Sequence, residues 1–223
     1  MAGIQRLLLL AGLLFWPGTG LGQTHYTPPA GCEALATLRL ASCVVRQISA
    51  CANGNISDQF SEGRLIGRAE YSHPSLFMRF IGTNGSVSGH KYGPGAPKLG
   101  DVLKRGQRFE YSREVYRNMG EPTPGDQGTE VMQVGRLGTI EIGQRSHKVR
   151  DIRFEVTNEA GYRYVERALI LVDPELTLGV TSRELASDGG TKSNYSSLPE
   201  AISLPGDPDF LGFDPAPSCL PAS

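Results

Sequence analysis

The histidines are the first side chains in this sequence to weigh for chemistry, because they could bind a metal or act as acid and base. The four are His25, His73, His90 and His147. No two of them form an H-x-H or H-E-x-x-H motif, the spacings that place two zinc ligands on one strand or helix. The histidines therefore predict no metal site.

One of them, His90, has an informative local context. Lys91 and Tyr92 follow it in the glycine-rich stretch SGHKYGPG. Loops carry function disproportionately often, and a flexible loop here could present these three side chains to a ligand or substrate. The alternative is that they are ordinary solvated loop residues. We take His90, Lys91 and Tyr92 as a candidate loop site, and a hydrolase acting through this loop as one functional hypothesis.

Familiar catalytic and cofactor motifs do not occur. There is no G-x-S-x-G motif, no P-loop and no G-x-G-x-x-G motif after a strand, and the prolines of YGPGAP remove backbone N–H groups that a phosphate-binding loop needs. The sequence therefore assigns no catalytic residue and no cofactor. A non-enzymatic protein is favoured.

The cysteines are Cys32, Cys43, Cys51 and Cys219, and an even number in an exported chain predicts two disulfides. Helical spacing of Leu35, Leu38, Val45 and Ile48 predicts a helix over residues 33–49. Along it, Cys32 and Cys43 would stand about 16 Å apart, beyond the roughly 7 Å limit for bridged Cα atoms. Cys43 and Cys51 would pair only if the chain folds back between them. We expect one N-terminal cysteine to pair with Cys219.

The N-terminus predicts export. Arg6 provides a positive charge, residues 7–16 form an apolar run too short to span a bilayer, and Gly20 and Gly22 mark a cleavage site before Gln23. Residues 1–22 are thus a signal peptide, and the mature chain is periplasmic or extracellular. The stretch PPAGC leaves open lipidation of Cys32 as an alternative to disulfide formation.

Length and charge narrow the classes further. About 200 residues suit a single domain with a core of its own, and we place it at residues 23–186. Lys and Arg number 22 and Asp and Glu 23, so no long-range field recruits nucleic acid. No later segment is long and apolar enough to be a transmembrane helix.

The middle of the chain reads as strands after the first helix. About eight are expected, among them residues 64–72, 75–82, 107–117, 129–135 and 137–143, with residues 82–100 as a long irregular connection. Few helical signals separate them. The fold class is therefore mainly β, an antiparallel meander forming a curved sheet or half barrel, with the N-terminal helix packed on it.

A hairpin can be predicted in more detail around NEAG. Asn158 and Gly161 suit the ends of a type I turn, closing a three-residue loop with glycine at positive φ. This register puts a row of side chains on one face, with Glu166 the one misfit: Ile152, Phe154, Val156, Tyr164, Ala168 and Ile170. The continuous apolar run ALILV (168–172) predicts a strand covered on both faces, one of them by the helix.

The tail, residues 187–223, is rich in Gly, Pro and Ser and is expected to lack regular structure. Cys219 would tether it. The aromatic stretch with Phe210, Leu211 and Phe213 either plugs one end of the sheet or serves as a partner-binding motif.

The stretches LKRGQRFEYSREVYR and GTIEIGQRSHKVRDIRFEVTNEAGYRYVERALILVDPELTLGV resemble the layout of uncharacterised β-rich periplasmic proteins of Gram-negative bacteria. Those typically have a G-x-x-x-x-Y strand entry, a glycine-punctuated hairpin and a late P-E-L-G turn. Here Thr177 follows Leu176, and the glycine is displaced to Gly179. The resemblance covers residues 103–185 and implies a half-barrel sheet, with no catalytic residues to transfer.

The leading functional hypothesis is an exported, non-enzymatic envelope protein. It would bind a lipid, another apolar ligand or an envelope protein on the concave face, at Ile152, Phe154, Val156, Tyr164 and Ile170. A third hypothesis, beside the hydrolase, is an interaction scaffold that uses the sheet edge or the aromatic tail segment.

Overall fold

The computed structural model describes residues 25–117, 127–161, 163–185 and 190–220. The expected signal peptide lies outside the described residues. Within them, no helix has the length and hydrophobicity needed to cross a membrane.

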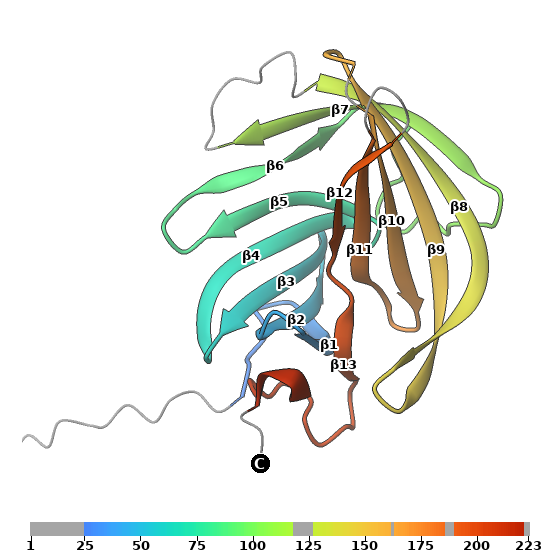
Figure 1. The fold of residues 1–223 in the computed structure, drawn as a ribbon. Coiled ribbons are helices and arrows are strands. Elements are labelled where there is room, and N and C mark those ends of the chain that lie inside the picture. Colours follow the sequence, from blue (N-terminus) through green and yellow to red (C-terminus); the bar gives the residue numbers. More distant parts are fainter. Residues whose placement is uncertain (1–24, 118–126, 162, 186–189, 221–223) are drawn as a thin grey trace, which may run out of the picture.

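The described residues form one antiparallel sheet of thirteen strands (Figure 1). The strands are β1 (Glu33–Leu40), β2 (Val44–Cys51), β3 (Gly54–Ser61), β4 (Arg64–His73), β5 (Leu76–Gly82), β6 (Val87–Tyr92), β7 (Arg108–Arg117), β8 (Gln127–Ile142), β9 (Arg145–Asn158), β10 (Arg163–Val172), β11 (Glu175–Leu185), β12 (Thr191–Ser196) and β13 (Pro199–Ser203). Each of the first twelve pairs with its neighbours in the chain, and β13 pairs with β1. The sheet is not closed, so β12 and β13 are its edges. The predicted mainly-β antiparallel meander is confirmed.

The predicted N-terminal helix is wrong: residues 33–51 form the hairpin of β1 and β2. Apolar and polar side chains in this segment also alternate with a period of two residues, which is the period of a strand. Leu38 and Ile48 point into the core, while Thr37 on the other face donates a 2.7 Å hydrogen bond to Gln47 across the hairpin. The only helix in the described residues is the short 3-10 helix η2 (Pro217–Cys219). Pairing with β3 and β13 stabilises the hairpin where local helical spacing was misleading.

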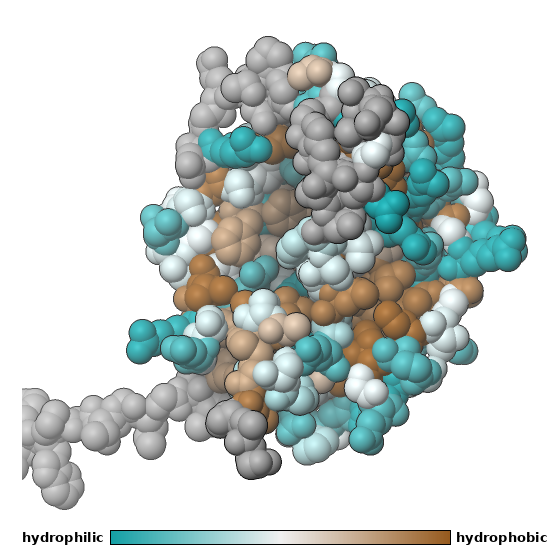
Figure 2. Space-filling view, in the orientation of Figure 1, coloured by the Kyte–Doolittle hydropathy of each residue, from teal (hydrophilic) through white to brown (hydrophobic). Residues whose placement is uncertain are grey.

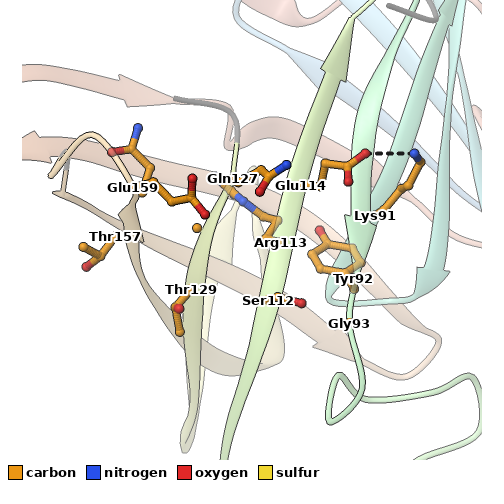
Figure 3. A pocket seen from close by; sticks show the side chains of 12 residues that line it. Lys91, Tyr92, Gly93, Ser112, Arg113, Glu114, Gln127, Thr129, Thr157 and Glu159 are labelled. Carbon is orange, nitrogen blue, oxygen red and sulfur yellow. Dashed lines mark hydrogen bonds and ion pairs between the residues drawn. The ribbon is translucent and has the colours of Figure 1, made fainter. Parts of the chain in front are cut away.

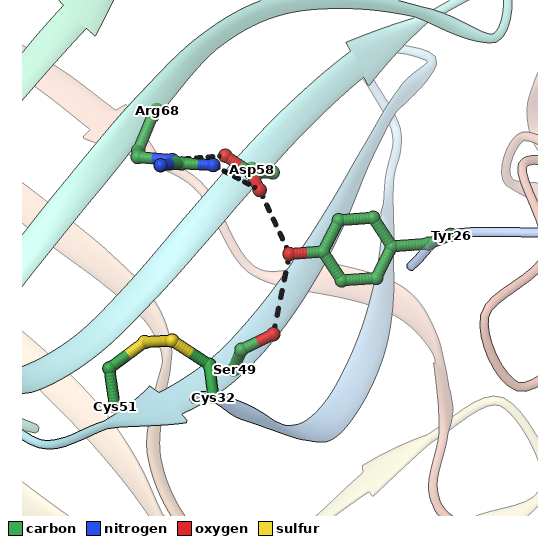
Figure 4. The surroundings of a disulfide bond; sticks show 6 residues. All are labelled: Tyr26, Cys32, Ser49, Cys51, Asp58 and Arg68. Atoms are coloured by element: carbon green, nitrogen blue, oxygen red, sulfur yellow. Dashed lines mark hydrogen bonds and ion pairs between the residues drawn. A yellow bond between two sulfur atoms is a disulfide. The ribbon is translucent and has the colours of Figure 1, made fainter. Parts of the chain in front are cut away.

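Two disulfides join the four cysteines. Cys32 pairs with Cys51 at the open end of the β1–β2 hairpin (Figure 4). Cys43, in the turn that joins β1 to β2, pairs with Cys219. The expectation of a bond between an N-terminal cysteine and Cys219 is confirmed, although the helix from which it was argued does not form. Because the Cys32 sulfur is held in a disulfide, the lipidation alternative for Cys32 is not supported.

One side of the sheet is concave. Leu38 of β1 and Ile48 of β2 pack against Ile142, Leu171 and Leu178 from β8, β10 and β11. These strands lie far apart in the sheet order, so a single sheet brings them together by curving. We call this group, with its buried neighbours, the first core cluster. Figure 2 shows a band of hydrophobic residues crossing the visible face from the side of β3 and β4 to β10 and β11.

The second core cluster continues the concave side toward β5–β7. It contains Met132, Ile152, Phe154, Ala168 and Ile170, together with Leu76, Leu103, Tyr111 and Val134. The β4–β5 turn also enters the interior, where the buried ring of His73 bonds to Ser75 Oγ at 2.7 Å and Thr177 Oγ1 donates to the carbonyl of Pro74. Burial lowers the pKa of His73. The run ALILV is divided between the two clusters, with Ala168 and Ile170 in the second and Leu171 in the first. Neighbouring Ile170 and Leu171 are both 2% exposed, as predicted for a strand covered on both faces, but no helix among the described residues provides the cover.

The C-terminal tail packs on the convex side of β1–β4. Leu211 and Phe213 contact an outer cluster of Tyr26, Val45 and Phe60, with 4.7 Å between the ring centroids of Phe60 and Phe213. Tyr26 also donates a 2.8 Å hydrogen bond to Asp58, which accepts two more from Arg68 (Figure 4). The aromatic tail is thus packed against the protein. The predicted plug at one end of the sheet is therefore wrong in its position, because Leu211 and Phe213 cover the outside of the sheet instead.

Two stretches expected to be irregular contain strands. β6 lies within the predicted connection 82–100, and β12 and β13 lie within the predicted irregular tail. Both predictions were wrong in this respect. Local composition did not indicate these strands, because they are stabilised by backbone hydrogen bonds to other strands of the sheet. β6 pairs with β5 and β7, β12 with β11, and β13 with β1.

The β9–β10 hairpin has the predicted register. Val156 is opposite Tyr164, Phe154 opposite Glu166 and Ile152 opposite Ala168. The turn is closed by a 3.0 Å hydrogen bond from the Gly161 N–H to the Asn158 carbonyl, and Gly161 has a φ of 79°.

Replacing Gly161 with alanine should lower the free energy of unfolding by about 1 kcal/mol, since a Cβ disfavours positive φ. No atom lies within 4 Å of the Cβ position, so the effect would come from the backbone alone. Gly138→Ala is the matched control: it also has open space but no positive φ, and should be neutral or slightly stabilising. Urea denaturation of both variants measures the difference. Equal stabilities would contradict the proposed role of the turn.

Candidate functional site

The predicted ligand-binding residues occupy the concave side of β9 and β10, but most of them are fully covered. The exposed fraction is 0% for Ile152, 5% for Phe154, 2% for Val156 and 2% for Ile170. Leu76 from β5 and Leu103 from the β6–β7 connection are part of the same cluster. This part of the trough is therefore filled by the protein's own side chains. Tyr164, nearer the β9–β10 turn, is only half-buried.

The candidate loop site is not in a loop. His90, Lys91 and Tyr92 belong to β6, so their side chains alternate between the two faces. Lys91 is exposed on the convex face and forms a 2.8 Å ion pair with Glu114 of β7. His90 and Tyr92 lie on the concave side, where Tyr92 contacts Tyr111 of the second core cluster.

Aromatic rings form a continuous row across β4–β7. Tyr71, Phe77, His90, Tyr92 and Tyr111 contact one another in that order, edge to face, with centroid distances of 5.4–5.9 Å. The Tyr92 hydroxyl donates to the Phe77 carbonyl at 2.8 Å and lies 3.1 Å from His90 Nδ1. Such contacts orient the rings beyond what their burial alone would achieve.

A buried ion pair stands beside this row. Arg113 of β7 and Glu130 of β8 are 3.1 Å apart, with side chains only 7% and 3% exposed. The Tyr111 hydroxyl donates a 2.6 Å hydrogen bond to the other oxygen of Glu130. The Arg113 guanidinium also lies 5.0 Å from the ring centre of Tyr164. The ion pair thus joins the β6 residues to Tyr164, bringing the two sets of predicted residues into one region of the concave face.

Glu166 completes this region from β10. It is opposite Phe154 in the register, on the same face as Tyr164, and is half-buried. Burial raises its pKa to about 7, with nearby Glu130 adding to the rise and Arg113 opposing it. Among the described contacts, its carboxylate has no hydrogen bond or ion pair. The polar site, as we call it, comprises Arg113, Glu130 and Glu166 with the surrounding rings of His90, Tyr92, Tyr111 and Tyr164.

The titratable rings of His90, Tyr92 and Tyr111 in the polar site are held neutral. Burial, assisted by the positive charge of Arg113, lowers the pKa of His90 to about 3. Burial also raises the pKa of Tyr92 and of Tyr111. At neutral pH the imidazole and both phenols are therefore uncharged. The residues around His90 are Phe77 and Tyr92, so its ring packs within the aromatic row.

Sequence reasoning missed Arg113, Glu130 and Tyr111, although a signal existed. Glu130 is in phase with Met132 and Val134, and Tyr111 with Arg113, so each charge occupies an inward position of an alternating strand. Glu166 stood out in the sequence for the same reason. A charge in phase with apolar residues often marks a buried polar group that needs a partner.

A hollow of about 580 Å³ lies along strands β6–β9, and its lining includes Tyr92 and Arg113 of the polar site (Figure 3). The hydroxyl residues Ser112, Thr129 and Thr157 form a row of opposed positions across β7, β8 and β9. Lys91 and Glu114 line its other end, joined by the ion pair drawn in Figure 3. These positions alternate with the inward residues and therefore lie on the convex face.

Comparisons with known proteins add no relative. No model of a protein family, no curated protein and no solved structure matches this chain.

Proposed function

We propose that the protein is an exported envelope protein that binds an amphipathic ligand on the concave face, with the polar site as its centre. The observation that carries the proposal is the combination, on one face, of half-buried aromatic rings with a few charged groups. Ligand sites of soluble proteins are commonly lined by aromatic and apolar side chains with a small number of placed polar groups.

The distribution of burial supports this location. The second core cluster is filled by its own side chains, and Tyr164, Tyr92 and His90 beside it are half-buried. The apolar chain of the ligand would lie against the rings. Burial of the ring surface that now faces water would stabilise the complex. The polar end of the ligand would then meet the charged groups.

Export is supported by two observations of different kinds. The sequence at residues 1–22 has the pattern of a signal peptide. The two disulfides are typical of proteins in oxidising compartments such as the periplasm.

Native mass spectrometry of the protein purified from its own compartment tests the proposal. We expect an additional mass of lipid size, which is released on denaturation. Tyr164→Ala should remove this mass, because it deletes a half-buried aromatic ring of the site. Tyr195→Ala is the matched control, since Tyr195 is 63% exposed near the sheet edge and should leave the bound mass unchanged. A folded wild-type protein without any bound mass, and without affinity for added amphiphiles, would refute the proposal.

A further inference from the structure

The charges of the polar site do not balance. Arg113 and Glu130 neutralise each other as a pair at 3.1 Å. Glu166 is the third charged group, and the nearby ionisable rings of His90 and Tyr92 are neutral at pH 7. With Glu166 ionised, the site carries one uncompensated negative charge in a half-buried position, which is costly unless a partner supplies the opposite charge.

The aromatic rings favour the same kind of partner. The faces of tyrosine rings attract cations, and the guanidinium of Arg113 already uses Tyr164 in this way at 5.0 Å. Tyr92 is close enough to Glu166 for the carboxylate charge to help raise the pKa of its phenol. A carboxylate with aromatic rings around it is the chemistry by which proteins bind alkylammonium groups.

The groups that face Glu166 from the neighbouring elements agree with this reading. β7 and β8 contribute Arg113 and Glu130, which are already paired, and β9 contributes the apolar Phe154 and Val156. On β11 the residue opposite Glu166 is Ser182, a neutral hydroxyl. An anionic ligand would be repelled by Glu166 and would find Arg113 occupied.

We propose that Glu166 binds an organic ammonium group, so that the ligand of the concave face is a cationic amphiphile. This inference rests on the proposed function and specifies the ligand's charge. The Glu166 carboxyl is protonated in part at neutral pH because its pKa is about 7. A bound cation favours the ionised form, so affinity rises as the pH increases through 7 and falls below it.

Calorimetric titration with decyltrimethylammonium, below its micelle concentration, tests the inference. Decyl sulfate and the neutral octyl glucoside serve as comparison probes. We expect the cation to bind at least about tenfold more tightly than either at about pH 8, and to lose on the order of tenfold in affinity at about pH 5.5. Glu166→Gln should abolish both the preference and the pH dependence. Glu155→Gln, on the outward face of β9 and paired with Arg153, should retain them.

The outcomes separate this inference from the proposed function. Equal binding of all three probes would overturn the cationic ligand and leave the binding function intact. Absence of binding by every probe would overturn the binding function itself. If Glu166→Gln kept the preference for the cation, the assignment to Glu166 would be wrong. The pH dependence of the wild-type protein decides the question even if that variant does not fold, because affinity that stays constant between the two pH values contradicts the inference.

Discussion

Replacing Arg113 with methionine is expected to lower the free energy of unfolding by about 3–5 kcal/mol at neutral pH. The change leaves Glu130, 3% exposed, without its ion-pair partner, while Tyr111 alone still donates to it. Removing one member of a buried pair is costly because the remaining charge stays desolvated. Urea denaturation followed by circular dichroism measures the loss.

The pH dependence of this loss has a definite sign. Burial already raises the pKa of Glu130, and without Arg113 it should rise further. A carboxyl whose pKa is higher in the folded state is better tolerated when protonated. The destabilisation of Arg113→Met should therefore be small at low pH, where Glu130 is protonated in both proteins. It should grow as the pH rises above the pKa of Glu130 in the folded wild-type protein, and level off above the higher pKa in the folded variant.

Arg108→Met is the matched control for this prediction. Arg108 is on the same strand and pairs with Glu110, but both side chains are about 60% exposed, at 63% and 60%. Exposed pairs contribute about 0–1 kcal/mol, so this variant should be nearly neutral. A similar loss of unfolding free energy in both variants would show that the buried ion pair contributes no more to the stability of the protein than an exposed pair does.

Removing the Cys43–Cys219 disulfide should destabilise the protein more than removing Cys32–Cys51. The two bonds span sequence separations of 176 and 19 residues. In the loop-entropy model the longer closure contributes about 5 kcal/mol and the shorter about 3 kcal/mol. The longer bond also holds the tail whose carbonyls at Asp209 and Asp214 accept hydrogen bonds from Arg39.

Serine double variants of each pair, compared by chemical denaturation, measure this difference. Limited proteolysis should also cut the tail of the Cys43→Ser/Cys219→Ser variant first, because only its packing then retains it. The Cys32→Ser/Cys51→Ser variant serves as the control and should keep a protected tail. Equal stabilities and equal cleavage would contradict the role of the long disulfide in fastening the tail.

Parts of the candidate site were accessible to sequence reasoning because they depend on local patterns. The alternation of β9 and β10 and the turn chemistry of Asn158 and Gly161 predicted which side chains share a face, and the register confirms it. The β1–β2 hairpin was not accessible in this way. Its apolar residues fit both helical and strand spacing, and only pairing with β3 and β13 selects the strand.

The polar site also could not be predicted from local sequence patterns. Glu166 was recognisable as a charge at an inward position, yet nothing local indicates that it meets Arg113 and Glu130. Arg113 is joined to Glu130 by the register of β7 with β8, and to Tyr164 by the curvature of the sheet. The interpretation of His90 as a loop residue failed because β6 is stabilised by its neighbours on both sides.

By itself, the sequence determined the antiparallel β class and the faces of the β9–β10 hairpin. The bond of Cys43 to Cys219 was expected from a helix that does not form, so the tertiary structure decided it. Only the tertiary structure decided that Leu76 and Leu103 fill the predicted trough, and that charge and aromatic rings gather at its half-buried end. The physical reason is that alternation and turn residues act between near neighbours in the chain. The curvature that makes two faces meet arises from packing among strands that are distant in sequence.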